Sequence, residues 1–413
     1  EDWNDGSIIL EHIKVFLKAR RATKDKIDLI TSLLGTVFKN RAMWKPTNGE
    51  SVIKSLYTQI SRDIIPLLEG NLHLDFTGKI LNSLSDWVSI ENDNANDVVL
   101  TPSYITHFMA KLARTNKDSF VWDLAMGSGG FLVSAMDIMI KDAKRTIQDS
   151  EEQAKKIRNI KENQLLGVEI LGNIYILAVL NMILMGDGST HMFNDDSHKI
   201  YKGLDFPANV FLLNPPYSAP GNGFNFVEEA LSQMSHGYAA ILIKENAGSG
   251  AGLPFTKRIL ERNTLVASIH MPDDVFTGKA SVQVAIYVFQ VARPHEEDDL
   301  VTFIDMSEDG YTRLARKKSS QEVNLQDTDH AKERYAEVEA IILGKKPKTE
   351  YYTEKNGKVI KDSISLMGND WTFAQHQTID TTPTEDDFKK TVAEYLSWKI
   401  SRLLENGDKN DGI

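Results

Sequence analysis

The sequence predicts an α/β protein with a doubly wound, mostly parallel sheet, and three observations support that prediction. Between residues 119 and 293, apolar runs of strand length alternate with segments of helical periodicity. A glycine-rich stretch follows the first of these runs, and polar residues stand directly after three of them. Because ligands bind such sheets at the carboxyl ends of the strands, we expect these polar residues to share one crevice.

Residues 1–95 are expected to form a helical domain ahead of the sheet. The clearest helix there carries its apolar residues on one stripe, at Ile53, Leu56, Tyr57, Ile60, Ile64 and Leu67. Pro66 is expected to bend this helix or to end it early. A further helix is predicted over residues 101–112, opened by Thr101 and by Pro102 at the first helical position.

The first predicted strand, residues 119–122, leads into a glycine-rich turn. Asp123 follows the strand, and Gly-Ser-Gly-Gly over residues 127–130 precedes an apolar helix from about Leu132. Glycines let a ligand approach the backbone, and the helix N-terminus aims its amides at that ligand. The turn lacks the Gly-Lys-Ser/Thr of a P-loop and the Gly-x-Gly-x-x-Gly of a dinucleotide site. It therefore indicates a ligand loop without identifying the ligand.

A second predicted strand, residues 164–169, ends in Glu169, where an acidic side chain can hold a ribose diol. Glu169 lies 46 residues after Asp123 (169 − 123), about twice the ~20 residues of dinucleotide sites. The charged stretch 141–163 accounts for the excess and is expected to be an inserted or extended helix. A short strand, residues 191–193, precedes a further pair of acidic residues.

The tetrapeptide Asn214-Pro215-Pro216-Tyr217 follows an apolar run at residues 210–213 that is expected to be a buried strand. The prolines stop the strand and contribute no N–H, so the turn is rich in acceptors and poor in donors. Such a turn suits a substrate whose amino group is held by both hydrogens. The alternative is an ordinary loop, since Asn-Pro is a common turn dipeptide.

With these motifs taken together, the chain resembles the adenine-specific DNA methyltransferases, and among them the modification subunits of type I restriction–modification systems. The resemblance covers about residues 76–306, including expected later strands at 237–243 and 271–276. It implies a Rossmann-like methyltransferase fold, S-adenosylmethionine as cofactor and the N6 amine of adenine in DNA as methyl acceptor. Leu124 and Leu100 depart from the family, which usually has proline at the first position and often an aromatic residue at the second.

The resemblance also implies the site residues. Cofactor contacts are expected from Leu100, Thr101, Pro102, Asp123, Ala125, Gly127, Ser128, Gly129, Gly130, Phe131 and Glu169. Asp196 is expected to contact the cofactor's adenine, with a polar loop containing an Asx turn as the alternative. The catalytic residues are expected to be Asn214, Pro215, Pro216 and Tyr217, with Tyr217 stacked on a target adenine flipped out of the duplex. No metal is required, because the sulfonium supplies the leaving group.

Composition restricts the alternatives. The chain has no cysteine, which excludes disulfides, thiolate metal sites and the cysteine nucleophile of cytosine-C5 methyl transfer. Its net charge of −11 has the wrong sign for a free-standing DNA binder, so either a basic face is hidden in the average or a partner supplies most of the DNA contact. The longest apolar stretch, residues 174–185, is too short to cross a bilayer and is interrupted by Asn181. A cytoplasmic protein with no membrane association is expected.

We therefore expect a helical domain (residues 1–95), a catalytic domain (96–300) and a small C-terminal helical extension (301–413) that is less regular before its terminal helix. Thr384 is expected to cap that helix, which packs on its own domain or on a partner helix. The resemblance implies two copies of the chain around one specificity subunit, often with a restriction subunit. The alternative functions are methylation of a protein glutamine or an RNA base amine, and a non-catalytic methylase-like scaffold.

Overall fold

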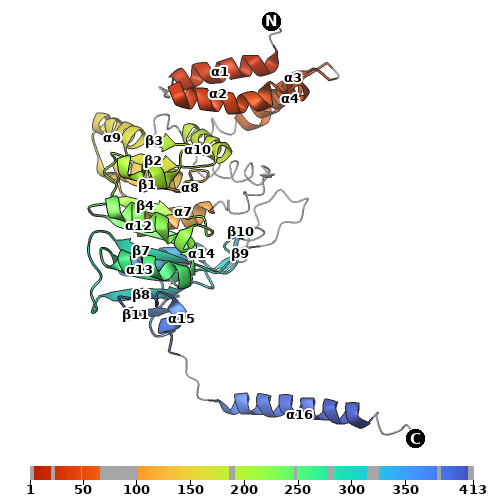
Figure 1. Ribbon diagram of the computed structural model, residues 1–413, viewed down its shortest axis with the longest axis vertical. Coiled ribbons are helices and arrows are strands. Elements are labelled where there is room, and N and C mark those ends of the chain that lie inside the picture. The colour runs from red at the N-terminus through yellow and green to blue at the C-terminus, as the bar shows by residue number, and fades with distance from the viewer. Residues whose placement is uncertain are drawn as a thin grey trace. The chain divides into compact units, whose positions relative to one another are not determined.

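The computed structural model describes residues 4–19, 24–47, 49–65, 101–185, 191–245, 249–276, 282–313, 325–378 and 383–407 (Figure 1). Two compact units are present, Glu1–His376 and Gln377–Ile413. The first contains the sheet and all the described residues that were expected at the site.

A nine-stranded sheet forms the centre of the first unit, in the order β11-β8-β6-β7-β5-β4-β1-β2-β3. Its strands are β1 (Val121–Asp123), β2 (Leu165–Val168), β3 (His191–Phe193), β4 (Val210–Leu213), β5 (Tyr238–Lys244), β6 (Thr264–His270), β7 (Val284–Gln290), β8 (Leu300–Asp305) and β11 (Val359–Ser363). Strands β1 to β5 pair in parallel, as do β6 and β8, whereas β7 and β11 run antiparallel to their neighbours. The predicted α/β fold with a mostly parallel sheet is confirmed. Strands β9 (Tyr311–Arg313) and β10 (Leu325–Asp327) form a separate two-stranded sheet.

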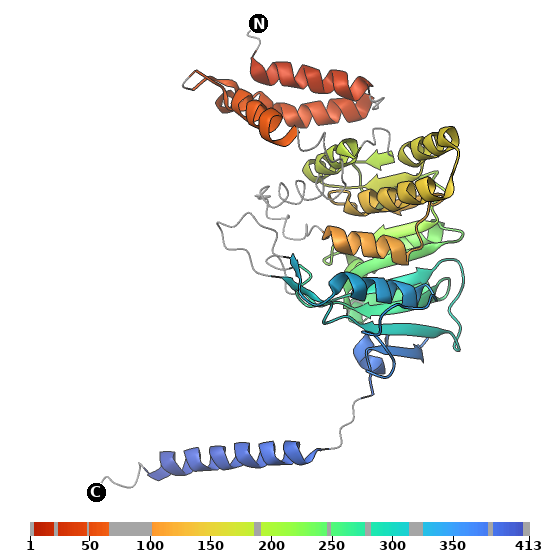
Figure 2. The same ribbon diagram turned by 180° about the vertical axis from the view of Figure 1, so that it is seen from behind.

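Helices cover both faces of this sheet, and the side chains of each strand alternate between them (Figures 1 and 2). Val210 and Leu212 of β4 face a core shared with α7 (Ser103–Leu112), α8 (Gly130–Thr146) and α14 (Ala331–Ile342). Phe211 and Leu213 face the opposite core, which contains α12 (Phe224–Gln233) and α13 (Leu253–Leu260). Burial on both faces explains why the strands are continuous apolar runs in the sequence.

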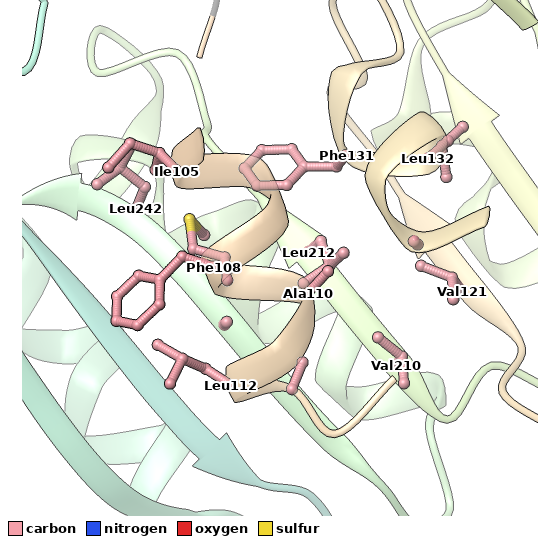
Figure 3. Close-up of a cluster of buried hydrophobic side chains, with 14 of the residues drawn as sticks. Ile105, Phe108, Ala110, Leu112, Val121, Phe131, Leu132, Val210, Leu212 and Leu242 are labelled. Atoms are coloured by element: carbon pink, nitrogen blue, oxygen red, sulfur yellow. The ribbon is translucent and has the colours of Figure 1, made fainter. Parts of the chain in front are cut away.

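Helix α7 places the segment that precedes β1 against the middle of the sheet. Figure 3 shows its Ile105 and Phe108 packed over the strands that carry Leu212 and Leu242, and all four side chains are buried. The helix begins at Ser103, one position later than predicted, with Pro102 as its N-cap in an extended conformation (φ −56°, ψ 143°). Thr101 therefore lies just outside the helix.

The remaining helices are α1 (Asp5–Ala19), α2 (Lys24–Phe38), α3 (Arg41–Trp44), α4 (Val52–Gln59), α9 (Ser150–Asn163), α10 (Gly172–Leu184), α11 (Ser197–Ile200), α15 (Phe373–His376) and α16 (Glu385–Gly407). A π-helical turn, η1 (Ile60–Ile64), continues α4, and short 3₁₀ turns lie at η3 (Tyr201–Gly203), η4 (Pro220–Gly223) and η6 (Gly250–Gly252). The helical insertion expected over 141–163 forms the end of α8 and all of α9. Pro66 and Leu67 lie outside the described residues.

Two expectations differ from the structure. Residues 271–276 form no strand, because β6 ends at His270 and Pro272 has no N–H to continue the pairing. The sheet also continues past the expected domain boundary at residue 300, since β8 and β11 belong to it. β11 is an edge strand on which only Val359 is fully buried, so the sequence there shows no apolar run.

The terminal helix, α16, is capped as expected. The Asp387 amide donates to the Thr384 hydroxyl (3.2 Å), and the Thr384 amide donates to the Asp387 carboxylate (2.9 Å). Six large apolar side chains of this helix are more than half exposed: Phe388, Val392, Tyr395, Leu396, Trp398 and Ile400. Among the described residues, no helix combines the length and the apolar character needed to cross a bilayer.

The turn before β5 generates a stability prediction. Gly237 has φ +111°, and a Cβ built on it would lie 1.9 Å from the Asn209 carbonyl oxygen. Gly237→Ala should therefore lower the free energy of unfolding by about 2–4 kcal/mol, measured by urea denaturation. Gly203→Ala is the matched control, because a Cβ at Gly203 would meet no atom within 4 Å. Equal stability of the two variants would contradict the close approach at Gly237.

Candidate active site

The carboxyl ends of four neighbouring parallel strands bring the predicted site residues to one edge of the sheet. The order β4-β1-β2-β3 places Asn214, Asp123 and Glu169 at the ends of adjacent strands, and Asp196 soon after the last. Residues more than 90 positions apart in the sequence thus lie along a single crevice. This juxtaposition was expected from the strand ends alone.

The glycine-rich turn adopts a conformation that other residues rarely take. Gly127 and Gly129 have φ of +54° and +80°, and Gly129 is the left-handed N-cap of α8. Within the described ranges no side chain caps this helix, which leaves its first-turn amides available to a ligand. From α10, the Asn181 side-chain amide donates to the Ser128 carbonyl (3.0 Å) and fixes the turn from behind. No role was expected for Asn181, although its position as a polar residue within an otherwise apolar helix could have indicated one.

Glu169 connects the end of β2 to the glycine-rich turn. One carboxylate oxygen accepts the Gly127 amide (3.1 Å) and the other accepts the Leu171 amide (2.8 Å). Burial nevertheless raises the pKa of Glu169, since the amide hydrogen bonds only partly offset the loss of solvent. The Asn194 side chain donates to the Glu169 carbonyl (2.8 Å) and holds the β3 end beside it.

Asp123 lies inside the turn and is fully buried. One oxygen accepts the Ala125 amide (3.1 Å), while the other has no hydrogen-bond partner among the described residues. Burial raises the pKa of Asp123 to about 8, more than the amide bond lowers it, and nearby Glu169 adds to the increase. The side chain holds the start of the turn and does not line the cavity described next.

A cavity of about 30 Å³ lies at the centre of the crevice. Its walls come from three separate segments, with the lining residues Thr101, Thr106, Ala125, Met126, Gly127, Ser128, Gly130, Phe131 and Asn214. A larger hollow of about 460 Å³ opens beside it along α7, α8 and α14. Thr101, Ser128 and Gly130 line both hollows. Hollows of several hundred Å³ are typical of small-molecule sites.

Asp196, which was expected to contact the cofactor's adenine, is not among the residues that line that cavity. The Asp196 carboxylate caps α11 by accepting the His198 amide (3.1 Å), and it lies 3.4 Å from the Lys199 ammonium. This is the Asx-type arrangement that was the alternative for this residue. Leu100 lies outside the described residues.

The Asn-Pro-Pro-Tyr turn presents an unpaired acceptor. The Asn214 amide nitrogen donates to the Thr101 hydroxyl (3.0 Å), while its Oδ1 is buried without a partner in the described part of the chain. The Pro215 ring packs closely against the backbone of Gly223 (φ +99°). A Cβ at Gly223 would lie only 2.7 Å from that ring. Burial raises the pKa of Tyr217, and the Lys244 ammonium lies 5.7 Å from the centre of its ring.

The buried Asp123 generates a pH prediction. A carboxyl with a pKa of about 8 in the folded chain and about 3.9 when unfolded stabilises the fold below pH 4 and loses that contribution as the pH rises to 8. Asp123→Asn keeps an oxygen for the Ala125 amide and removes the titration. Urea denaturation between pH 5 and 8 should show a shallower loss of stability in this variant, by up to about 1.4 kcal/mol per pH unit. Identical slopes would place the Asp123 pKa in its ordinary range.

Curated relatives agree with the expected resemblance. The chain is 29% identical over 432 residues to a type II restriction enzyme and methyltransferase, RM.BcgI, of Heyndrickxia coagulans, covering 98% of this chain and 62% of that protein. It is 23% identical over 218 residues to the methylase subunit of the type I restriction enzyme EcoEI of Escherichia coli, covering 48% of this chain and 43% of that subunit. The chain thus spans less than two thirds of the length of either relative.

Solved structures share the fold. A chain from a type I R-M system superposes with a TM-score of 0.60 at 18% identity, covering 100% of this chain and 86% of that one.

The model of the N-6 DNA methylase family matches residues 84–222 and 219–397, more than half of the sequence. The chain therefore belongs to the N-6 DNA methylase family.

Proposed function

We propose that this chain transfers a methyl group from S-adenosylmethionine to the N6 amine of adenine in DNA, as the modification subunit of a restriction–modification enzyme. The observation that carries the proposal is the position of Asn214. Its buried, unpaired Oδ1 belongs to a residue that lines the same cavity as the glycine-rich turn. An acceptor for an amine and a loop for a cofactor therefore meet at one point.

The residues around the glycine-rich turn suit this cofactor. The uncapped amides at the start of α8 favour a carboxylate such as that of the methionine moiety. Glu169 stands at the end of β2, where a carboxylate can accept from ribose hydroxyls. When bound, the sulfonium supplies an activated methyl group and a neutral leaving group. Because a cavity of about 30 Å³ holds little more than one water molecule, we infer that its walls separate on binding.

The acceptors around Asn214 suit an exocyclic amine. The lone pair of this amine is delocalised into the ring, which makes the nitrogen a poor nucleophile. Acceptance of its two hydrogens by Asn214 Oδ1 and the Pro215 carbonyl favours a tetrahedral nitrogen with a localised lone pair, which is electrostatic stabilisation by preorganised dipoles. Tyr217 offers an aromatic face to a flipped base, an interaction of about 1–3 kcal/mol.

We propose that two copies of this chain work with one DNA-reading specificity subunit, together with a restriction activity. Its charge of −11 opposes independent DNA binding. The exposed apolar residues of α16 offer a surface for a partner helix. The relatives named as a restriction enzyme and methyltransferase, and as a methylase subunit of a type I enzyme, support such an assembly.

The catalytic assignment predicts a separation of chemistry from cofactor binding. Asn214→Ala should abolish tritium transfer from labelled S-adenosylmethionine to DNA, because the acceptor for the amine is lost, while calorimetry should show unchanged cofactor affinity. Tyr217→Ala should reduce transfer strongly, and Tyr217→Phe only slightly, since stacking needs the ring. Transfer to RNA or protein instead of DNA would refute the proposed substrate, and equal damage by Phe and Ala would refute stacking.

The proposed assembly predicts that a change on α16 weakens subunit association and leaves cofactor binding intact. Leu396→Glu should weaken association with a co-expressed specificity subunit at least tenfold in sedimentation experiments, because it places a charge on the apolar face of α16. Ser397→Glu adds the same charge at an exposed polar position of the same helix and should leave association unchanged. Both variants should bind the cofactor normally. Sequence-specific methylation by the purified chain alone would contradict the need for a specificity subunit.

A further inference from the structure

We propose that Thr101 is a positioning residue that holds the Asn214 side-chain amide in place for the reaction. The proposal rests on the proposed function, in which Asn214 accepts a hydrogen from the substrate amine. Thr101 was expected only to contact the cofactor. Its hydroxyl also makes the one hydrogen bond that the structure gives to the Asn214 side chain within the described residues.

The two ends of an amide are nearly equal in shape but opposite in hydrogen bonding. Asn214 assists the reaction only when Oδ1 faces the amine, because a rotated side chain would point its own NH₂ donors at the donors of the substrate. In the structure, Nδ2 donates to Thr101 Oγ1 at 3.0 Å, and Oδ1 is left buried and unpaired. A rotated amide would exchange this bond for one in which the Thr101 hydroxyl donates to Oδ1, and it would turn Nδ2 toward the substrate amine, so Thr101 holds the side chain in place and the two bonds of Asn214 are compatible only when Oδ1 faces the amine.

The segment that carries Thr101 is firmly anchored. Three residues along, the Tyr104 hydroxyl accepts two hydrogen bonds from the Arg313 guanidinium, at 3.1 and 3.0 Å. Arg313 is only 6% exposed and is paired with the buried carboxylate of Asp309, which also accepts the Tyr335 hydroxyl (2.7 Å). This cluster joins the start of α7 to β9 and α14.

A second attachment fixes α7 to its neighbour on the sheet. The Thr106 and Ser134 hydroxyls form a buried hydrogen bond of 2.7 Å between α7 and α8. The rings of Tyr104, Tyr311 and Tyr335 pack with centroids 5.0–5.8 Å apart. With the start of the helix held on two sides, the Thr101 hydroxyl has a defined position from which to hold the Asn214 side chain.

The test separates the hydroxyl from the rest of the side chain. Thr101→Val keeps the shape and removes the acceptor, whereas Thr101→Ser keeps the acceptor. In the chain assembled with its specificity subunit and saturated with S-adenosylmethionine, Val should lower kcat for DNA methylation on the order of 10–100-fold. Ser should restore it to within about threefold. Cofactor affinity by calorimetry should change little in either variant.

The control and a second readout make the outcome decisive. Thr146→Val removes a hydroxyl that bonds within α8, to the Asp142 carbonyl, and should leave kcat unchanged. In protein labelled with ¹⁵N-asparagine, the side-chain amide signal lost in Asn214→Ala should exchange its hydrogens faster in Thr101→Val than in the wild type. This signal reports the hydrogen bond even if DNA proves not to be the substrate.

Two results would overturn the proposal. One is a Thr101→Val enzyme with unchanged kcat and unchanged exchange of the Asn214 amide. The other is a variant with weakened cofactor affinity but normal kcat at saturation, which would limit Thr101 to cofactor binding. Failure of the wild-type assembly to methylate DNA would instead refute the proposed function, while the amide signal would still decide whether Thr101 holds Asn214.

Discussion

The parallel pairing of β4, β1 and β2 is the constraint on which the rest of the site depends. Val121 of β1 is in register with both Leu165 of β2 and Val210 of β4, so the three strands end at nearly the same height. Each strand end carries a polar residue, and the crossover helices return on the faces of the sheet. The edge is therefore left free for a ligand, and a slip in register would separate the glycine-rich turn from Asn214.

Buried acidic groups at this edge shape the backbone. Asp123 and Glu169 both have raised pKa values because burial disfavours their charged forms. Each carboxyl accepts backbone amides of the turn or of the segment after β2. These hydrogen bonds offset part of the free-energy cost of burying the carboxyls, and they order a glycine-rich backbone that would otherwise be mobile. We interpret the two carboxyls as parts of one structural unit with the turn, of which Glu169 also has the position to meet a ribose.

Much of this arrangement could be predicted from the sequence, because strands buried on both faces leave unbroken apolar runs and their ends are marked by glycine, proline or acidic residues. What escaped prediction depends on contacts between distant segments. β11 contributes to the sheet as an exposed edge without an apolar run, and the Arg313 cluster joins residues more than 200 positions apart. The cofactor role of Asp196 stays a prediction, and the cap that its carboxylate forms on α11 depends on local contacts.

The region after residue 300 therefore contributes to the architecture around the predicted site. β8 and β11 extend the sheet, and Arg313 and α14 hold the start of α7, whose preceding residue Thr101 contacts Asn214. α16 lies in the second compact unit, and six of its large apolar side chains are more than half exposed. The helix is capped and presents six large apolar side chains, a surface suited to packing against another helix or domain. The region after residue 300 thus contains one part that supports the predicted site and a separate compact unit that carries α16.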